Sequence, residues 1–255
     1  MSQLQQLQEL MRTLRLSETA NDLPELIREA EKKDLSFTQF LFEMATYEQS
    51  RRDEKQLEKR FKWATFPFHS TVDGYDLKEQ KSLSSKKLNQ LRDLTWLEQL
   101  YNIIFLGPPG VGKTHLSIGL GIEALNQGYK VIFTTMGDLI HTLKTEEITR
   151  KSKTRMKRIR EADLVIIDDL MFMAMDKQEA NMFFHLINNL YNQTSIILTS
   201  NKGPKEWGEL LGDQAITTAI LDRILHRVEI IHLNEDSWRM KHRKTIFGDQ
   251  VFQIN

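Results

Sequence analysis

The sequence predicts an α/β fold: a mostly parallel five-stranded sheet with helices on both faces, preceded by a small all-α N-terminal domain. From residue 101 onward, short runs rich in Ile and Val alternate with helical stretches, which is the pattern of βαβ units. Before residue 65, apolar residues recur at helical spacing instead. The runs expected to form strands are residues 102–106, 130–134, 164–168, 195–199 and 228–233.

The same patterns divide the chain into four segments. We expect a helical domain over residues 1–65, a connector over 66–99, the α/β domain over 100–233 and a short C-terminal segment over 234–255. Within the helical domain, Leu23–Pro24 is expected to interrupt a first helix. Ser36 is expected to cap a later helix, and a long charged helix is expected over residues 51–62.

Composition excludes several classes of protein. The 255 residues include 35 basic and 35 acidic side chains and no cysteine, which excludes disulfides and thiolate metal sites. No apolar run approaches the about 18 residues of a membrane span, and the first residues lack a secretory pattern. We therefore expect a cytoplasmic protein without a membrane partner.

The octapeptide GPPGVGKT follows the first expected strand and opens an expected helix over residues 115–126. In this context, GxxxxGK[ST] predicts a loop whose backbone N–H groups hold nucleotide phosphates at a helix N-terminus. Lys113 is expected to reach the β- and γ-phosphates, and the Thr114 hydroxyl to bind Mg²⁺. The residues expected to hold ATP are Gly107, Pro108, Pro109, Gly110, Val111, Gly112, Lys113 and Thr114.

Two later strands end in polar residues, where ligands bind in open α/β sheets. The run LVIIDDL places Asp168 at a strand end, where we expect it to hold Mg²⁺. Asp169 is expected to polarise the attacking water. The run SIILTSN ends in Asn201, which is expected to orient water against the γ-phosphate, with Thr199 or Ser200 as alternatives.

Arginines near the C-terminal end are candidates for contacts with the γ-phosphate. Arg223 lies on an apolar helical stretch, AILDRILHR, where a cation is costly unless it meets an anion. It is expected to reach the nucleotide of a neighbouring subunit, with Arg227 as the substitute candidate. A pair with Asp222 or an exposed position is the alternative for Arg223. Arg239, in SWRMK, is expected to contact the γ-phosphate of its own subunit.

A concentrated basic segment lies between the second and third expected strands. Residues 150–160, RKSKTRMKRIR, hold seven basic residues and no acidic one, which predicts sequence-independent contact with duplex DNA. An exposed helix face is the alternative. Lys62, Trp63 and Phe66 add a second basic and aromatic group. The candidate DNA-binding residues are Arg150, Lys151, Lys153, Arg155, Lys157, Arg158 and Arg160.

Taken together, these motifs resemble those of the AAA+ ATPases of the initiator and helicase-loader type. Nearly the whole chain resembles the IstB family of insertion-sequence helper ATPases, relatives of the DnaC-type loaders. The resemblance rests on LSFTQFLFEMATYEQSRR, FKWATFPF, GPPGVGKTHLSIGLG, LVIIDDL, TSNKGPKEWGELLGD, AILDRILHR and SWRMK.

The resemblance implies Walker A at residues 107–114, Walker B at Asp168 and Asp169, sensor 1 at Asn201, an arginine finger at Arg223 and sensor 2 at Arg239. It also implies an ATPase that assembles on duplex DNA as a homo-oligomer, with ATP at subunit interfaces, and activates the transposase of the same element. A replicative helicase loader, acting on single-stranded DNA with a helicase as partner, is the alternative. A stand-alone P-loop kinase is a third possibility.

The chain departs from the AAA+ pattern in two places. Asp169 stands where many AAA+ proteins have Glu, and its shorter side chain is expected to slow hydrolysis more than it weakens nucleotide binding. Residues 234–255 are too few for a full helical lid. Neighbouring subunits are therefore expected to complete the site.

Overall fold

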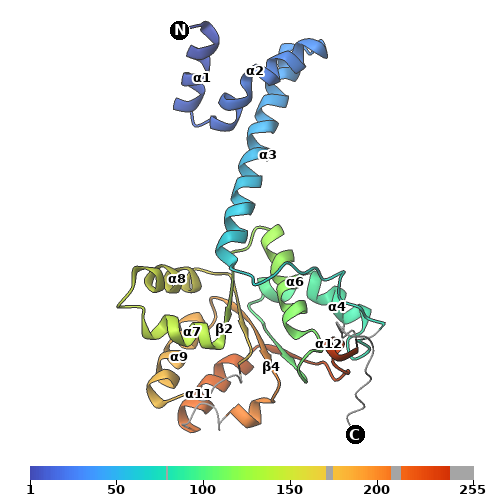
Figure 1. The fold of residues 1–255 in the computed structure, drawn as a ribbon, viewed down its shortest axis with the longest axis vertical. Coiled ribbons are helices and arrows are strands. Elements are labelled where there is room, and N and C mark those ends of the chain that lie inside the picture. Colours follow the sequence, from blue (N-terminus) through green and yellow to red (C-terminus); the bar gives the residue numbers. More distant parts are fainter. Residues whose placement is uncertain (79, 171–174, 208–213, 242–255) are drawn as a thin grey trace, which may run out of the picture. The chain divides into compact units, whose positions relative to one another are not determined.

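The computed structural model describes residues 1–78, 80–170, 175–207 and 214–241 (Figure 1). The chain divides into two compact units, Met1–Lys62 and Trp63–Asn255. Within the described residues, none of the helices combines the length and the apolar character that crossing a membrane requires.

The N-terminal unit is built from helices around a small core. A capping box between Ser2 and Gln5 starts the first helix, and the buried residues Met11, Ala20 and Leu23 form the core. As expected, Ser36 caps the third helix, because its Oγ accepts a hydrogen bond from the N–H of Gln39 at 3.3 Å. The helices are α1 (Gln3–Thr13), α2 (Ser17–Lys32) and α3 (Phe37–Ala64).

Pro24 does not interrupt a helix, contrary to the expectation from sequence. It lies inside α2, which continues to Lys32. A proline within a helix leaves the carbonyl four residues earlier without its donor. Here that carbonyl belongs to Ala20, and it accepts a hydrogen bond from Gln8 Nε2 of α1 at 2.8 Å. The tertiary contact therefore compensates for the missing bond. The charged stretch 51–62 is likewise part of α3, which begins at Phe37.

Glu48 of α3 joins α2 through buried hydrogen bonds. Its carboxylate accepts the N–H and the hydroxyl of Thr19 at 2.7 and 2.8 Å, and Arg52 Nε at 2.7 Å. Burial by itself would raise the pKa of Glu48, but these hydrogen bonds hold the pKa below its ordinary value. The charged carboxylate thus fastens the N-terminus of α2.

The second unit contains the expected five-stranded parallel sheet, in the order β2-β3-β4-β1-β5. Each run of Ile and Val forms a strand because both faces of the sheet are covered, so that nearly every side chain of the first four runs is buried. The observed bounds differ from the expected ones by one residue at three strands. The strands are β1 (Asn102–Leu106), β2 (Val131–Thr135), β3 (Leu164–Asp168), β4 (Ser195–Ser200) and β5 (Val228–His232).

Helices cover both faces of this sheet, which confirms the predicted fold class (Figure 1). Val165 and Ile167 of β3 belong to the core beneath α7 (Met136–Lys144), α8 (Arg150–Arg160), α9 (Lys177–Leu190) and α11 (Gln214–Leu225). Ile166 points to the other face, where a Cβ on Gly121 of α6 (Lys113–Asn126) would meet it at 2.8 Å. The short elements are α4 (Ser85–Arg92), α5 (Thr95–Glu98), η1 (Pro204–Glu206) and α12 (Trp238–Lys241).

Residues 66–99 do more than connect, since they form α4 and α5 and pack along α6. Ser70 Oγ donates to the carbonyl of His115 at 2.7 Å, and His115 Nε2 lies 3.2 Å from the carbonyl of Thr71. Further along α6, Arg92 forms an ion pair with Glu123 at 3.1 Å. This segment therefore forms a fixed wall beside the first turns of α6.

A candidate nucleotide site at the carboxyl edge of the sheet

The glycine-rich loop connects the end of β1 to the start of α6. Gly112, the residue before α6, has a left-handed backbone with φ of +93°. A Cβ there would lie 2.8 Å from the ring of Tyr75, so both conformation and space require glycine. This turn leaves the first N–H groups of α6 open to an anion.

Lys113 lies across this loop. Its Nζ donates to the carbonyl oxygens of Gly107 and Pro108 at 2.7 and 2.9 Å. Burial lowers the pKa of Lys113, the charges of Asp168 and Asp169 act to raise it, and the nearby charge of Arg239 lowers it further. Two cations and two carboxylates therefore influence one another in a single site.

Asp168, at the end of β3, is held by two hydroxyl groups. Thr114 Oγ1 donates to its carboxylate at 2.9 Å, and Thr199 Oγ1 donates to it at 2.6 Å. Burial raises the pKa of Asp168, and these two hydrogen bonds act to lower it. The structure thus brings together the two residues predicted to hold Mg²⁺.

These oxygen donors suit Mg²⁺, which binds proteins through one or two carboxylates, with phosphates and water completing the shell. Within the described ranges, no cluster of three or more His, Cys, Asp or Glu side chains forms a complete metal cage. Thr114 and Asp168 therefore fit a metal that arrives with a nucleotide.

Thr199 of β4 also fixes the backbone of Asp169. Asp169 has a left-handed φ of +58°, which is uncommon and costs about 1–3 kcal/mol for a residue with a side chain. Its N–H donates to Thr199 Oγ1 at 2.8 Å, and the next N–H, from Leu170, donates to the Thr199 carbonyl at 3.0 Å. The strained turn thus leaves the Asp169 side chain exposed beside Asp168.

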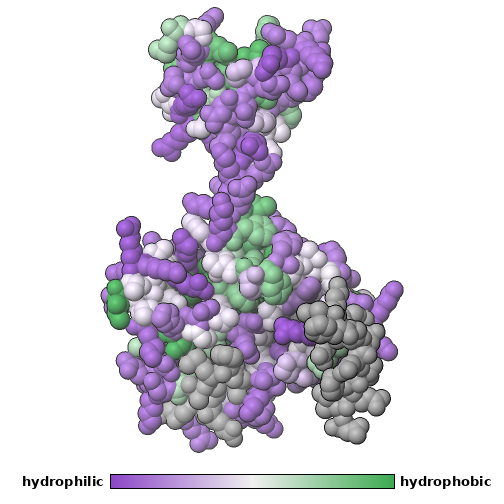
Figure 2. Space-filling model, in the orientation of Figure 1, coloured by the Kyte–Doolittle hydropathy of each residue, from purple (hydrophilic) through white to green (hydrophobic). Residues whose placement is uncertain are grey.

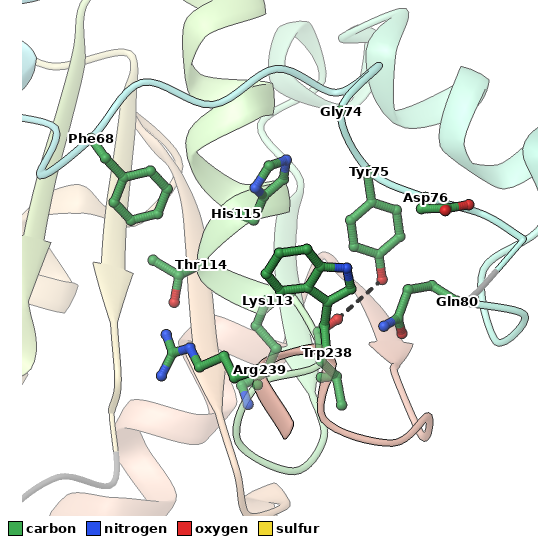
Figure 3. Close-up of a pocket in the computed structure, with 13 residues that line it drawn as sticks. Phe68, Gly74, Tyr75, Asp76, Gln80, Lys113, Thr114, His115, Trp238 and Arg239 are labelled. Carbon is green, nitrogen blue, oxygen red and sulfur yellow. Dashed lines mark hydrogen bonds between the residues drawn. The ribbon is translucent and has the colours of Figure 1, made fainter. Parts of the chain in front are cut away.

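Asn201 and Arg239 both lie at this edge of the sheet. Asn201 follows β4 directly, and the carbonyl of the preceding residue, Ser200, accepts the N–H of Gly107 at 3.2 Å. Arg239 belongs to α12, whose Trp238 N–H donates to the carbonyl of Gly110 at 3.0 Å. Both side chains are exposed, and Arg239 lines a cavity with Lys113 and Thr114 (Figure 3).

Arg223 lies at the opposite edge of the sheet. Its guanidinium donates to Asn188 Oδ1 at 2.9 Å and to the Ala219 carbonyl at 2.8 Å, and lies 4.9 Å from the ring centroid of Phe184. It lines a cleft with Asn102, at the amino end of β1. The structure therefore does not bring Arg223 to the loop of its own chain. The substitute candidate, Arg227, lines the same cleft and donates to the Gln99 carbonyl at 3.3 Å.

The basic segment forms α8, whose exposed side is strongly hydrophilic (Figure 2). Some cations of the segment have acidic partners, although the segment itself contains no acidic residue. Acids that flank the helix approach two of them: Arg160 pairs with Glu146 at 2.7 Å, and Lys157 pairs with Glu161 at 3.7 Å. The composition of residues 150–160 could not reveal these ion pairs, because the acidic partners lie outside that segment.

The remaining part of α8 faces a cavity of about 420 Å³. Arg158 lies 4.9 Å from the ring centroid of Trp63, and Arg155 donates to the Phe133 carbonyl at 3.3 Å. The structure therefore joins Trp63, from the second basic and aromatic group, to the basic helix. The cavity residues are Trp63, Thr65, Ile132, Arg150, Lys151, Thr154, Arg155 and Arg158.

Comparison with known proteins shows the family of this chain. The model of the IstB-like ATP-binding proteins matches residues 9–246. The chain belongs to this family. A protein of insertion sequence IS21 from Pseudomonas aeruginosa, named for ATP binding, is 35% identical over 94% of this chain and 91% of its own. An IS21-like protein of Bacteroides fragilis, also named for ATP binding, is 37% identical over 98% and 95% of the two chains.

Solved structures confirm the AAA+ fold of this IstB-like chain. The DnaC helicase loader superposes with a TM-score of 0.53 at 21% identity, over 64% of this chain and 96% of that one. The replication initiator DnaA, in a structure with AMPPCP and single-stranded DNA, gives a TM-score of 0.52 at 25% identity, over 67% and 52% of the two chains. The predicted resemblance to the IstB family and to AAA+ initiators and loaders is therefore confirmed.

Proposed function

We propose that this protein hydrolyses ATP, assembles on duplex DNA as a homo-oligomer with ATP at subunit interfaces, and activates the transposase of its insertion sequence. The observation that carries the proposal is the meeting of Lys113, Thr114, Asp168 and Asp169 at one edge of the sheet. The relatives add the context, since they are insertion-sequence proteins named for ATP binding.

In the proposed reaction, Lys113 and the N–H groups at the start of α6 hold the phosphates. Mg²⁺, held by Thr114 and Asp168, would neutralise charge on the phosphate oxygens. Asp169 accepts a proton from water as the water oxygen bonds to the γ-phosphorus, with Asn201 orienting that water. The bond from the γ-phosphorus to the bridging oxygen breaks, and its electron pair leaves with ADP.

The position of Arg223 supports a shared site. The γ-phosphate end of the loop and Arg223 lie at opposite edges of one sheet, so that this arginine can reach a nucleotide only in another copy of the chain. An arginine supplied by a neighbour stabilises charge in the transition state. Arg239 lies beside the loop of its own chain, and this position supports the proposed contact between Arg239 and the γ-phosphate of the same subunit.

The DNA contact is proposed for α8. Arg150, Lys151 and Lys153 are exposed on the first turns of this helix, and Arg158 lies at the rim of the adjoining cavity. Neutralising DNA phosphates with such cations releases counterions and gives affinity without sequence preference. Arg160 and Lys157, which have acidic partners, are expected to contribute less.

A replicative helicase loader remains the second candidate, favoured by the superposition with the DnaC loader. That superposition supports the fold alone, whereas the relatives similar over nearly the whole chain are insertion-sequence proteins. Adding a purified transposase or a purified helicase to the assembled protein separates the two candidates, because only the true partner should change activity.

Imaging tests the proposal as a whole. Protein mixed with duplex DNA and a slowly hydrolysed ATP analogue should form filaments or rings around the duplex by electron microscopy. Lys113→Ala should abolish this nucleotide-dependent assembly, because the phosphates lose their cation. Normal assemblies formed by Lys113→Ala with the analogue, or none formed by the unaltered protein, would contradict the proposal.

A further inference from the structure

The cavity of about 420 Å³ beside α8 lies within the second unit, because every residue that lines it belongs to that unit. Its walls come from α8, from Trp63 and Thr65, and from Ile132 of β2. The lining residues of α8 are at positions 150, 151, 154, 155 and 158, a spacing that places them on one face of the helix. A cavity of this size lies within the range of ligand sites, about 300–1,000 Å³.

The lining of this cavity carries concentrated positive charge. It includes cations and no acidic side chain. Lys157 and Arg160 of the same helix form ion pairs with acidic side chains, whereas the cations of the cavity form none among the residues that the structure describes. Like charges around one space repel one another unless an anion lies between them. The cavity therefore suits an anionic ligand. Its cations are Arg150, Lys151, Arg155 and Arg158.

Two of these cations are oriented by neutral groups. The guanidinium of Arg158 lies 4.9 Å from the ring centroid of Trp63. The guanidinium of Arg155 donates to the Phe133 carbonyl at 3.3 Å, and the same carbonyl accepts the hydroxyl of Thr65 at 3.0 Å. An indole ring or a carbonyl oxygen attracts a guanidinium without neutralising its charge. Both cations are thus held in position while their charge remains for a ligand.

A sugar–phosphate backbone fits this lining better than a single carboxylate does. Guanidinium groups bind phosphate through paired N–H donors, and Trp63 and Ile132 present apolar surface to a sugar. Lys153 is exposed on the same helix outside the cavity, so that the positive surface continues beyond it. Duplex DNA carries one negative charge per about 1.7 Å of its axis, so that a single duplex can occupy the cavity and this surface together.

We propose that this cavity binds one sugar–phosphate unit of duplex DNA, with the phosphate at Arg155 and Arg158 and with Trp63 as the residue that positions Arg158. The proposal rests on the DNA contact proposed for α8 and deepens it, because it gives a role to a neutral residue outside that helix. A charged helix face by itself gives Trp63 no role. Loss of the indole should therefore weaken DNA binding although no charge is removed.

Fluorescence anisotropy with a labelled duplex tests the role of Trp63. Trp63→Leu should weaken duplex binding about three- to tenfold at low salt, because Arg158 loses the ring that orients it. Trp63→Phe should retain most of the affinity, because it keeps an aromatic ring at this position. A thermal melt of each variant shows whether it is folded.

Arg155→Gln and Lys157→Gln are a matched pair that tests the phosphate contact. Each removes one charge from α8, and of the two residues Arg155 lines the cavity whereas Lys157 pairs with Glu161. Arg155→Gln should flatten the slope of log affinity against log salt by about 0.9, and Lys157→Gln should flatten it less. This pair decides the matter should Trp63→Leu unfold early in the melt.

Full duplex affinity in a folded Trp63→Leu variant, or equal slopes in the matched pair, would overturn the cavity as a DNA subsite while leaving the DNA contact of α8 intact. Binding of polyglutamate that weakens in Trp63→Leu, with duplex binding unchanged, would assign the cavity to an acidic peptide. Loss of ATP binding in Arg155→Gln, with duplex binding unchanged, would assign it to a free nucleotide. Failure of the unaltered protein to bind duplex at low salt would contradict the proposed function itself.

Discussion

At the scale of residues, the hydroxyl of Thr199 makes hydrogen bonds to both acidic residues of the candidate site. It donates to the Asp168 carboxylate at 2.6 Å and accepts the N–H of Asp169 at 2.8 Å, while β4 buries its side chain to 1% exposure. One small group therefore orients both acidic residues of the site. Because Asp169 is held in a left-handed conformation, its orientation depends on this support.

We expect Thr199→Val to lower kcat for ATP by about tenfold or more with little change in ATP affinity, because Asp169 loses its orientation while the phosphate loop is untouched. Thr199→Ser should retain most activity, because it keeps the hydroxyl. Steady-state hydrolysis and equilibrium nucleotide binding measure the two effects separately.

Thr194→Val is the matched control for this prediction. Thr194 is also buried and directly precedes β4. Its hydroxyl donates to the Ala162 carbonyl at 2.9 Å, at the end of the sheet opposite Asp168. Its replacement should cost stability of the same order and leave kcat unchanged. Equal reductions of kcat in the Thr194 and Thr199 variants would show that the effect is general weakening of the sheet.

At the scale of elements, α8 combines a structural side and a charged side. Ser152, Met156 and Ile159 are buried at the helix face that contacts the core, and the cations occupy the rest. The capping hydroxyl of Thr149 and basic residues in the last turn both stabilise this helix. The cations of α8 therefore divide into those that support the fold and those available to a polyanion.

Replacing Arg150, Lys151 and Arg158 together with Gln should reduce the salt dependence of duplex DNA binding. The slope of log affinity against log salt should flatten by about 0.9 for each DNA phosphate that the variant no longer neutralises. The control is Arg160→Gln, because Arg160 pairs with Glu146 and its replacement should leave the slope unchanged. Fluorescence anisotropy across a salt series measures this slope. Equal slopes in the unaltered protein, the triple variant and Arg160→Gln would show that α8 is only a solvated helix face.

At the scale of the whole molecule, the second unit holds the phosphate loop and Arg223, the two parts of the proposed shared site, at opposite edges of one sheet. The phosphate loop lies at the carboxyl edge, and the cleft with Arg223 lies at the amino edge. Head-to-tail contacts between identical subunits bring such edges together, and they generate rings or open helical filaments. The cation of Arg223 is held in place by Asn188 and Phe184, so that its orientation does not depend on another subunit.

Mixing two inactive variants tests whether Arg223 acts on a neighbour. Arg223→Ala subunits keep their own acidic residues, and Asp169→Asn subunits keep Arg223, so that mixed interfaces restore one complete site. We expect each variant alone to hydrolyse ATP slowly and the mixture to recover activity. Absence of recovery, with both variants folded by circular dichroism, would assign Arg223 to its intrachain contacts alone.

The sequence by itself determined the features that depend on short segments. Runs of Ile and Val identified all five strands to within one residue, because strands buried on both faces need continuous apolar side chains. The glycine-rich loop was recognisable because the backbone turn and the lysine lie within eight consecutive residues. Asp168 was recognisable because it ends an apolar strand, where parallel sheets bind ligands.

Only the tertiary structure decided contacts between distant segments. Pro24 stays inside α2 because Gln8 replaces its missing hydrogen bond, and Arg160 is neutralised by Glu146, which lies outside the basic run. Arg223 lies at the amino edge, and Trp63 lies beside Arg158 of α8. The physical reason is that hydrogen bonding, burial and charge compensation depend on neighbours in space, and local periodicity does not specify which distant residues those are.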